Sequence, residues 1–144
     1  MLQEITARAW FERMWTLQEV VLAESRVVVC GGSRLPWDVL LPQALLFNDY
    51  EWHNLPSAFK SSRRVWNSWA RLRREKWLTP FLTAACSKKA TDPRDKVFAL
   101  YAIVTEIGVR MPKPDYSKTI PQVYSEATLA CLENDGSYEV LEHI

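Results

Sequence analysis

The sequence has few of the residues that build metal centres, disulfide frameworks and phosphate-binding loops. Its 144 residues include three cysteines, two histidines and four glycines. The cysteines are odd in number and lack Cys-x-x-Cys spacing, which indicates reduced, buried thiols in an intracellular protein. The glycines never reach the spacing of a nucleotide-binding loop. We therefore expect no metal site and no resident cofactor.

Long hydrophobic runs and an excess of one charge are also missing. The longest apolar stretch, 97–104, is far shorter than the ~20 residues of a membrane helix. Glu4 and Arg8 argue against a secretory signal at the N-terminus. Eighteen Lys and Arg against 17 Asp and Glu leave a net charge of +1. These features predict a cytoplasmic protein that binds neither nucleic acid nor a membrane.

Tryptophan is what the sequence has in abundance. Seven tryptophans occur in a chain that is 48% hydrophobic and 24% charged, and each can bury roughly 200 Å². No repeat, low-complexity tract or long linker divides the chain. The sequence therefore predicts one domain over 1–144.

Hydrophobic periodicity predicts several helices and one clear strand. A helix is expected over 5–24, with an apolar face formed by Trp10, Met14, Leu17 and Val21. Residues 26–30 then form a short buried strand that stops at two glycines, and a helix followed by a strand indicates an α/β unit. Further helices are expected over 36–47, 60–77, 92–107 and 121–133, with loops over 48–57 and 112–118.

The helix expected over 92–107 begins in a dense cluster of charges. Asp92 can cap the helix, Pro93 suits the first helical position, and Asp95 lies in the first turn. Asp92 and Lys96 are spaced as an i,i+4 ion pair. Because every member of the cluster has a structural reason to be there, we interpret it as architecture rather than as a substrate site.

The helix expected over 60–77 combines basic and aromatic residues. Seven cations and one acid are interleaved with three tryptophans, a pattern that could bind phosphates and stack bases. However, Trp66 and Trp69 follow the same apolar face as Val65 and Leu72. An amphipathic helix with a solvated basic face is therefore the favoured interpretation.

Glu19 is the carboxylate with the clearest chemical signal. It follows Trp15 by four residues, so a helix places the indole beside the carboxylate. A carboxylate held against an aromatic wall can stabilise a nearby cation. The alternative is a solvated glutamate on a helix surface, which is the commoner case.

Three segments carry longer motifs. The first reads Arg8-x-Trp10-Phe11-x-Arg13-x-Trp15-Thr16-Leu17-Gln18-Glu19 and continues with Ala23 and Val27-Val28-Val29-Cys30-Gly31. The second reads Thr91-Asp92-Pro93-Arg94-Asp95-Lys96-Val97-Phe98-Ala99-Leu100. The third reads Asp115-Tyr116-Ser117-Lys118-Thr119, followed by Val123-Tyr124. Together and in this order, the three segments resemble the fungal heterokaryon incompatibility (HET) domain family.

The resemblance implies an α/β fold that is TIR-like (flavodoxin-like). HET domains normally begin upstream, with a strand carrying a Leu-Ser-Tyr-x-Trp-Gly-like motif and then an Ile-Asp-x-x-Cys-Ile-Asn-Gln-like motif. Neither motif occurs in this sequence. We therefore expect residues 1–144 to be a single partial HET domain, its helix-rich C-terminal part with few short strands.

The resemblance also implies a function. HET domains trigger growth arrest or cell death when genetically different fungal cells fuse. They are distantly similar to TIR domains, some of which hydrolyse NAD with a glutamate four residues after a tryptophan. On that basis Glu19 is the candidate catalytic residue, and Trp15 would shield the site from water. Arg8 and Arg13 would bind the pyrophosphate of NAD, the implied substrate.

Two other interpretations stay open. The chain could be a non-enzymatic signalling module that self-associates or recruits other incompatibility proteins, with the tryptophan-rich helix over 65–77 as its surface. This alternative predicts that replacing Trp66 or Trp69 disrupts assembly without unfolding the chain. The chain could also be an inactive truncated remnant, because the upstream motifs are lacking.

Overall fold

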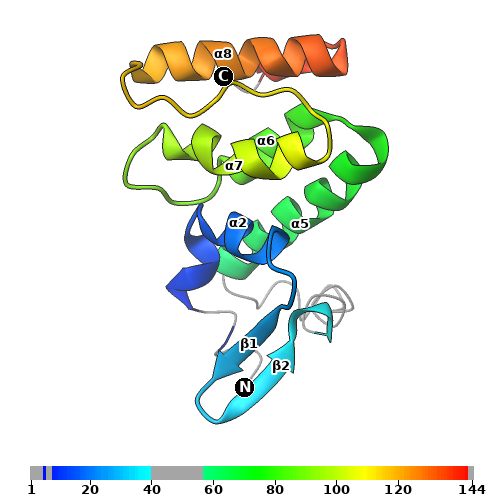
Figure 1. Cartoon of the computed structure of the whole chain (residues 1–144), viewed down its shortest axis with the longest axis vertical. Coiled ribbons are helices and arrows are strands. Elements are labelled where there is room, and N and C mark those ends of the chain that lie inside the picture. The colour runs from blue at the N-terminus through cyan, green and yellow to red at the C-terminus, as the bar shows by residue number, and fades with distance from the viewer. Residues whose placement is uncertain (1–4, 6–7, 40–56, 143–144) are drawn as a thin grey trace.

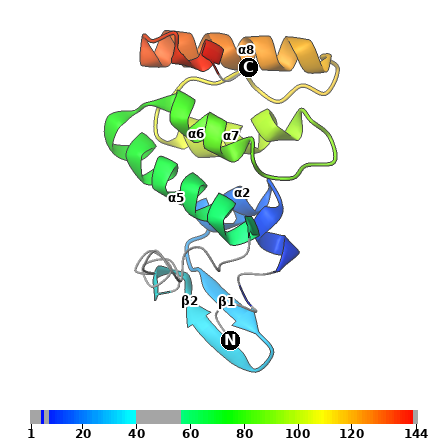
Figure 2. The same ribbon diagram turned by 180° about the vertical axis from the view of Figure 1, so that it is seen from behind.

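The computed structural model describes residues 5, 8–39 and 57–142, which form helices and one small sheet (Figure 1). The elements in chain order are η1 (Ala9–Glu12), α2 (Thr16–Val21), β1 (Val27–Cys30), β2 (Ser33–Pro36), α5 (Ser57–Glu75), α6 (Leu78–Ala85), α7 (Asp95–Glu106), α8 (Ile120–Asp135) and η2 (Glu139–Glu142). The sheet lies at one end of the molecule and α8 at the other, with α5, α6 and α7 between them (Figures 1 and 2). A helix-rich chain with a small sheet is what the sequence predicted.

The helix expected over 5–24 is interrupted by a backbone contact from a distant part of the chain. The amide of Met14 donates to the carbonyl of Lys89 (2.9 Å), and the amide of Lys89 donates to the carbonyl of Glu12 (2.6 Å). Between them Arg13 is extended, with φ −76° and ψ 139°. The prediction of one continuous helix was wrong because these bonds replace helical ones, and the segment forms η1 and α2 instead.

The expected strand is present as β1, but it is only partly buried. It pairs with β2 in an antiparallel hairpin rather than in a crossover unit. Gly31 and Gly32 join the two strands, and Gly31 has a φ of +61°, which glycine adopts without a steric penalty. Val27 and Val29 are 49% and 63% exposed. The expectation of a buried strand was therefore wrong for these two side chains.

The helix expected over 60–77 is confirmed as α5, with an earlier start and an earlier end. Val65, Trp66 and Leu72 are buried on one face of it. The ring of Trp69 packs against that of Phe81, with 5.5 Å between the centroids. Trp66 and Trp69 therefore pack in and against the core, and the expectation that they offer a surface to a partner is corrected.

The short helix α6 was not predicted, because Pro80 reads in sequence as the end of a helix. In the structure Pro80 lies in the first turn of α6, where a missing amide costs no helical hydrogen bond. The amides of Leu78 and Thr79 donate to the two carboxylate oxygens of Asp135, each over 2.7 Å. Asp135, the last residue of α8, thus caps α6 from another helix.

Helices α7 and α8 follow their predicted ranges closely, since local signals define their ends. α7 begins at Asp95 rather than at Asp92, because a turn occupies the residues between them. The expectations that Asp92 caps this helix and that Pro93 takes its first position were therefore wrong. α8 begins with a capping box and a proline in its first turn. A glycine in the left-handed conformation follows each helix, Gly108 with φ +82° and Gly136 with φ +62°.

The middle of the chain lies outside the described residues. The helix expected over 36–47 is described only as far as residue 39, and the loop expected over 48–57 falls outside apart from Ser57, which begins α5. His53 and His143 also lie outside these ranges. Within them, no helix is long and apolar enough to cross a membrane.

Candidate functional site

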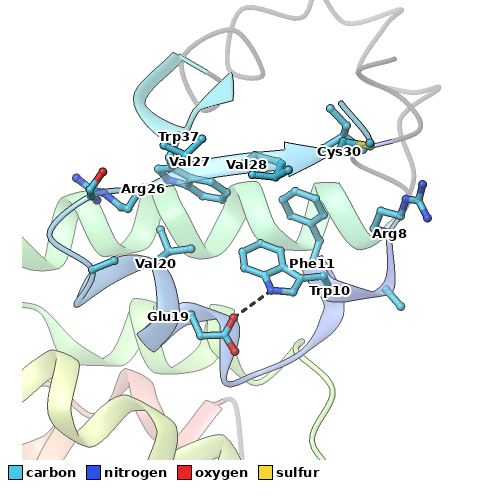
Figure 3. A pocket seen from close by; sticks show the side chains of 16 residues that line it. Arg8, Trp10, Phe11, Glu19, Val20, Arg26, Val27, Val28, Cys30 and Trp37 are labelled. Carbon is cyan, nitrogen blue, oxygen red and sulfur yellow. Dashed lines mark hydrogen bonds between the residues drawn. The ribbon is translucent and has the colours of Figure 1, made fainter. Parts of the chain in front are cut away.

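A pocket lies between β1 and the segment formed by η1 and α2 (Figure 3). Its volume of about 900 Å³ is within the range of small-molecule sites. Most of its lining comes from these elements and from the residues that flank β1, with Trp37 completing the wall. Glu19 and Arg8, two of the residues singled out in the sequence, both line this pocket.

The carboxylate of Glu19 is held by a tryptophan at the pocket. The Nε1–H of Trp10 donates to Oε2 of Glu19 over 3.0 Å (Figure 3). Glu19 lies in the first turn of α2, where the helix dipole favours a negative charge. Glu19 is exposed, so a bound molecule can reach its carboxylate.

Trp10 is itself fixed by a cluster of aromatic rings. Its ring makes edge contacts with Phe11 and Trp37, at centroid distances of 5.1 and 6.1 Å. Trp37 in turn contacts Trp66 at 5.3 Å. Phe11, Trp37 and Trp66 are all buried. The indole that binds Glu19 is therefore anchored on the core, which restricts where the carboxylate can lie.

The tryptophan that contacts Glu19 is not the one that its spacing suggested. The Nε1–H of Trp15 donates instead to Oδ2 of Asp95, over 3.2 Å. Among the described residues, neither Trp15 nor Arg13 lines the pocket. Of the four candidate site residues, the structure therefore brings Glu19 and Arg8 together and places the other two elsewhere.

Two arginines lie at opposite ends of the pocket (Figure 3). Arg8 is exposed next to η1, and Arg26 directly precedes β1. The Nη2 atom of Arg26 is 3.5 Å from Oδ1 of Asp38, which is a weak surface contact. Val20 and Val28 form part of the wall between the arginines. The site thus combines a carboxylate, two cations and an apolar wall, which suits an anionic molecule with a cationic or aromatic part.

Sequence reasoning missed Trp10 and Arg26 as pocket residues. Trp10 and Glu19 are nine residues apart, which puts them on opposite faces of a continuous helix. Only the interruption at Arg13 turns the chain so that the two side chains meet. Arg26 was assigned to the strand and carried no signal of its own, so neither residue could be found from local spacing.

The three motif segments meet at Asp95, away from the pocket. One carboxylate oxygen of Asp95 accepts from Trp15 in the first segment, and the other accepts from the hydroxyl of Tyr116 in the third, over 2.5 Å. The hydrogen bond to Asp95, together with burial, raises the pKa of Tyr116 to about 12. Asp95 therefore joins parts of the chain that are 80 and 21 residues away from it.

Arg94 connects the same segments through the backbone. Its guanidinium contacts both carboxylate oxygens of Asp92 and donates to the carbonyl of Tyr116 over 2.7 Å. Its hydrogen bonds hold the pKa of Asp92 below its usual value. Lys96 donates to the carbonyl of Cys86 (2.9 Å), so the partner of Asp92 is Arg94 rather than the expected Lys96. These contacts agree with the interpretation of the charged cluster as architecture.

Neither a metal cluster nor a known relative adds to this picture. Within residues 5, 8–39 and 57–142, no group of three or more His, Cys, Asp or Glu side chains could hold a metal ion. No family model, curated protein or solved structure matches the chain. The pocket and the motifs are therefore the basis on which a function can be proposed.

Proposed function

We propose that this chain is the C-terminal part of a HET-type, TIR-like domain that triggers cell death in fungal non-self recognition, and that it cleaves NAD at Glu19. The main support is the exposed carboxylate of Glu19, held by Trp10 at a pocket of about 900 Å³ that Arg8 also lines. The meeting of the three motif segments at Asp95 supports the resemblance on which the cell-death role rests.

The chemistry needs a carboxylate close to the bond that breaks. When the bond between C1′ of the ribose and the pyridinium nitrogen breaks, its electron pair leaves with neutral nicotinamide, and an oxocarbenium-like cation remains on the ribose. The carboxylate of Glu19 stabilises this cation and accepts hydrogen bonds from the ribose hydroxyls. Water then adds to C1′ and loses a proton, which gives ADP-ribose.

The other pocket residues hold the substrate and the carboxylate. Arg8 binds the pyrophosphate, since a guanidinium donates paired hydrogen bonds to phosphate oxygens. Trp10 fixes Glu19 and shields one side of it, the role that the resemblance gave to Trp15. Arg13 has no part in this scheme, because it lies outside the pocket lining.

Release of nicotinamide from NAD by the purified chain tests this function. We expect turnover by the parent chain and a loss of roughly 100-fold or more in Glu19→Gln, because the amide lacks the charge that stabilises the cation. Glu24→Gln, which removes an exposed carboxylate just after α2, is the matched control and should leave turnover unchanged. Circular dichroism of all three chains checks that each is folded. A folded parent chain without turnover, or full turnover in Glu19→Gln, contradicts the proposal.

A non-enzymatic module that self-associates is the second candidate, and the hairpin is the feature that favours it. Val27 and Val29 expose 49% and 63% of their surface on β1, and exposed valines on a strand suit pairing with a second copy. Sedimentation of the parent chain, of the double variant Val27→Thr/Val29→Thr and of the control Leu129→Thr tests it. Self-association that only the double variant loses supports this candidate, and a parent chain that stays monomeric rejects it.

A further inference from the structure

Lys88 is a buried lysine, 2% exposed, that the proposed chemistry does not use. Its Nζ donates to the carbonyl of Phe11 and to Oγ of Ser62, the latter over 2.5 Å. The hydroxyl of Ser62 donates to the same carbonyl over 2.8 Å. The carbonyl oxygen of Phe11 thus accepts two hydrogen bonds from two distant segments, which uses both of its lone pairs.

The residue after Lys88 fixes the same turn through the backbone. Lys89 forms the main-chain bonds with Glu12 and Met14 that interrupt the N-terminal helix. Its Nζ also contacts Oε2 of Glu12 at 2.6 Å, where the lysine side chain is 74% exposed. The turn η1 is therefore held on its buried side by Lys88 and on its surface side by Lys89.

The turn η1 is the element that presents Trp10 to Glu19. Trp10 directly precedes Phe11, and their rings are in edge contact at 5.1 Å (Figure 3). A movement of the Phe11 peptide therefore moves the indole that binds the carboxylate.

We propose that Lys88 is a positioning residue of the pocket: by fixing the carbonyl of Phe11, its ammonium holds the indole of Trp10 within hydrogen-bonding distance of Glu19. This inference rests on the proposed function only in taking the pocket as the active site. A methionine could fill the same space without the cost of burying a charge. The buried charge therefore costs stability, and what it supplies in return is a fixed geometry of η1.

Burial makes this arrangement sensitive to pH. Burial lowers the pKa of Lys88 to about 8, and the negative charge of Glu12 partly opposes this shift. Glu12 is itself paired with Lys89, and the partner on α5, Ser62, is an uncharged hydroxyl. Below this pKa the ammonium donates charge-assisted hydrogen bonds, whereas above it the neutral amine donates weaker ones. The position of Trp10 should therefore change as the pH rises through the pKa of Lys88.

The indole N–H resonances of two tryptophans test the proposal by NMR. Trp10 and Trp15 both donate to a carboxylate, but only Trp10 lies on the turn that Lys88 holds. The titration is measured in the parent chain and repeated in Cys30→Ser, which has no thiol in the pocket lining. We expect the Trp10 resonance to follow a titration with its midpoint near pH 8, while that of Trp15 stays constant over the same range.

Two lysine variants make the test specific. Lys88→Met removes the ammonium but keeps an unbranched apolar side chain, so it should shift the Trp10 resonance at pH 7 and abolish its titration. Lys89→Met removes only the surface pair with Glu12 and should keep the titration. A Trp10 resonance that does not titrate near pH 8 in the parent chain overturns the proposal, and so does equal titration in Lys88→Met. The parent titration needs no lysine variant, so it decides the matter even if Lys88→Met does not fold.

The measurement contains no substrate, so its result is separate from that of nicotinamide release. Titration of Trp10 without any release of nicotinamide would support Lys88 as the positioning residue and reject catalysis at Glu19. Release of nicotinamide with a constant Trp10 resonance would reject Lys88 as the positioning residue and support catalysis at Glu19.

Discussion

The hairpin end of the molecule and the central helices α6 and α7 differ in how completely their side chains are buried. Six side chains on α6 and α7 have no exposed surface: Leu78, Ala85, Ala99, Leu100, Ile103 and Val104. On β1, in contrast, Val27 and Val29 are 49% and 63% exposed, and the pocket with Glu19 lies beside this strand. The closely packed helices therefore supply most of the stability, and they support the η1–α2–β1 region with its pocket.

A few polar contacts connect the two regions. Lys88 and Lys89, which lie between α6 and α7, bind the backbone of η1. Asp95, the first residue of α7, accepts the indole N–H of Trp15 just before α2. The packed helices therefore determine where η1 and α2 lie, and with them Trp10 and Glu19.

We expect the greatest loss of stability from a cavity among the packed central helices. Leu100→Ala removes a side chain with no exposed surface, and we expect it to lower the free energy of unfolding by about 2–5 kcal/mol. Val29→Ala, on the exposed strand, should cost less than about 1 kcal/mol. Urea unfolding of the parent chain and both variants measures the difference. Equal losses in the two variants would contradict the division into packed central helices and an exposed hairpin.

The pH dependence of stability tests the contact of Lys88 with η1, which joins the packed helices to the pocket region. The unfolded chain keeps the proton of Lys88 up to the ordinary value of 10.5, but the folded chain loses it at about 8. Because the unfolded state binds more protons in this window, stability rises with pH there. We expect the free energy of unfolding of the parent chain to rise relative to Lys88→Met by about 2 kcal/mol from pH 8 to 9.5.

Comparison with Lys88→Met is needed, because other groups lower the free energy of unfolding as the pH rises. Tyr116 and Cys131 have raised pKa values, so their contributions to stability are lost as the pH rises. Both residues are present in the parent chain and in Lys88→Met, so their contributions cancel in the difference between the two free energies of unfolding. A difference that stays constant with pH would show that Lys88 keeps its ordinary pKa in the folded chain.

A smaller effect is expected from the cap by which Asp135 of α8 holds the start of α6. Burial raises the pKa of Asp135, but its hydrogen bonds with Thr79, Leu78 and Asn134 outweigh this and hold it below the usual value. Asp135→Ala should lower the free energy of unfolding by about 1–2 kcal/mol at pH 7. The exposed Glu133 on the same helix provides the control, and Glu133→Ala should have almost no effect.

The direction in which acid changes the effect of Asp135→Ala can also be predicted. The stability that Asp135 contributes is present above the ordinary aspartate value of 3.8 and is lost as the pH falls through its lower folded value. The difference in stability between the parent chain and Asp135→Ala should therefore narrow in acid. A difference that widens there would assign the effect of the substitution to something other than the carboxylate cap.

The fold was predictable from sequence where local signals decide the structure. The start of α8 depends on a capping box and a proline, and a glycine with positive φ follows both α7 and α8, all within a few residues of the helix. The interruption at Arg13 depends instead on Lys89, which is 76 residues away, and no local pattern contains that information. α6 was missed because its cap, Asp135, comes from a different helix.

The candidate site was predictable only in part. Glu19 and Arg8 were identified and do line the pocket. The partner of Glu19 was not, because the helix periodicity that suggested Trp15 does not extend through Arg13. Lys88 carried no signal in the sequence, since a buried lysine cannot be told from an exposed one by its neighbours in the chain.

Titration of the chain with NAD, followed through the indole resonances of Trp10 and Trp15, shows whether this pocket binds the proposed substrate. The two residues report on the two regions, since Trp10 lines the pocket and Trp15 contacts the first residue of α7. We predict that NAD shifts the Trp10 resonance in a saturable way, leaves that of Trp15 unchanged, and has a weaker effect in Arg8→Ala. A saturable shift of Trp15 alone, or no shift of Trp10 at any NAD concentration, would contradict the assignment of this pocket.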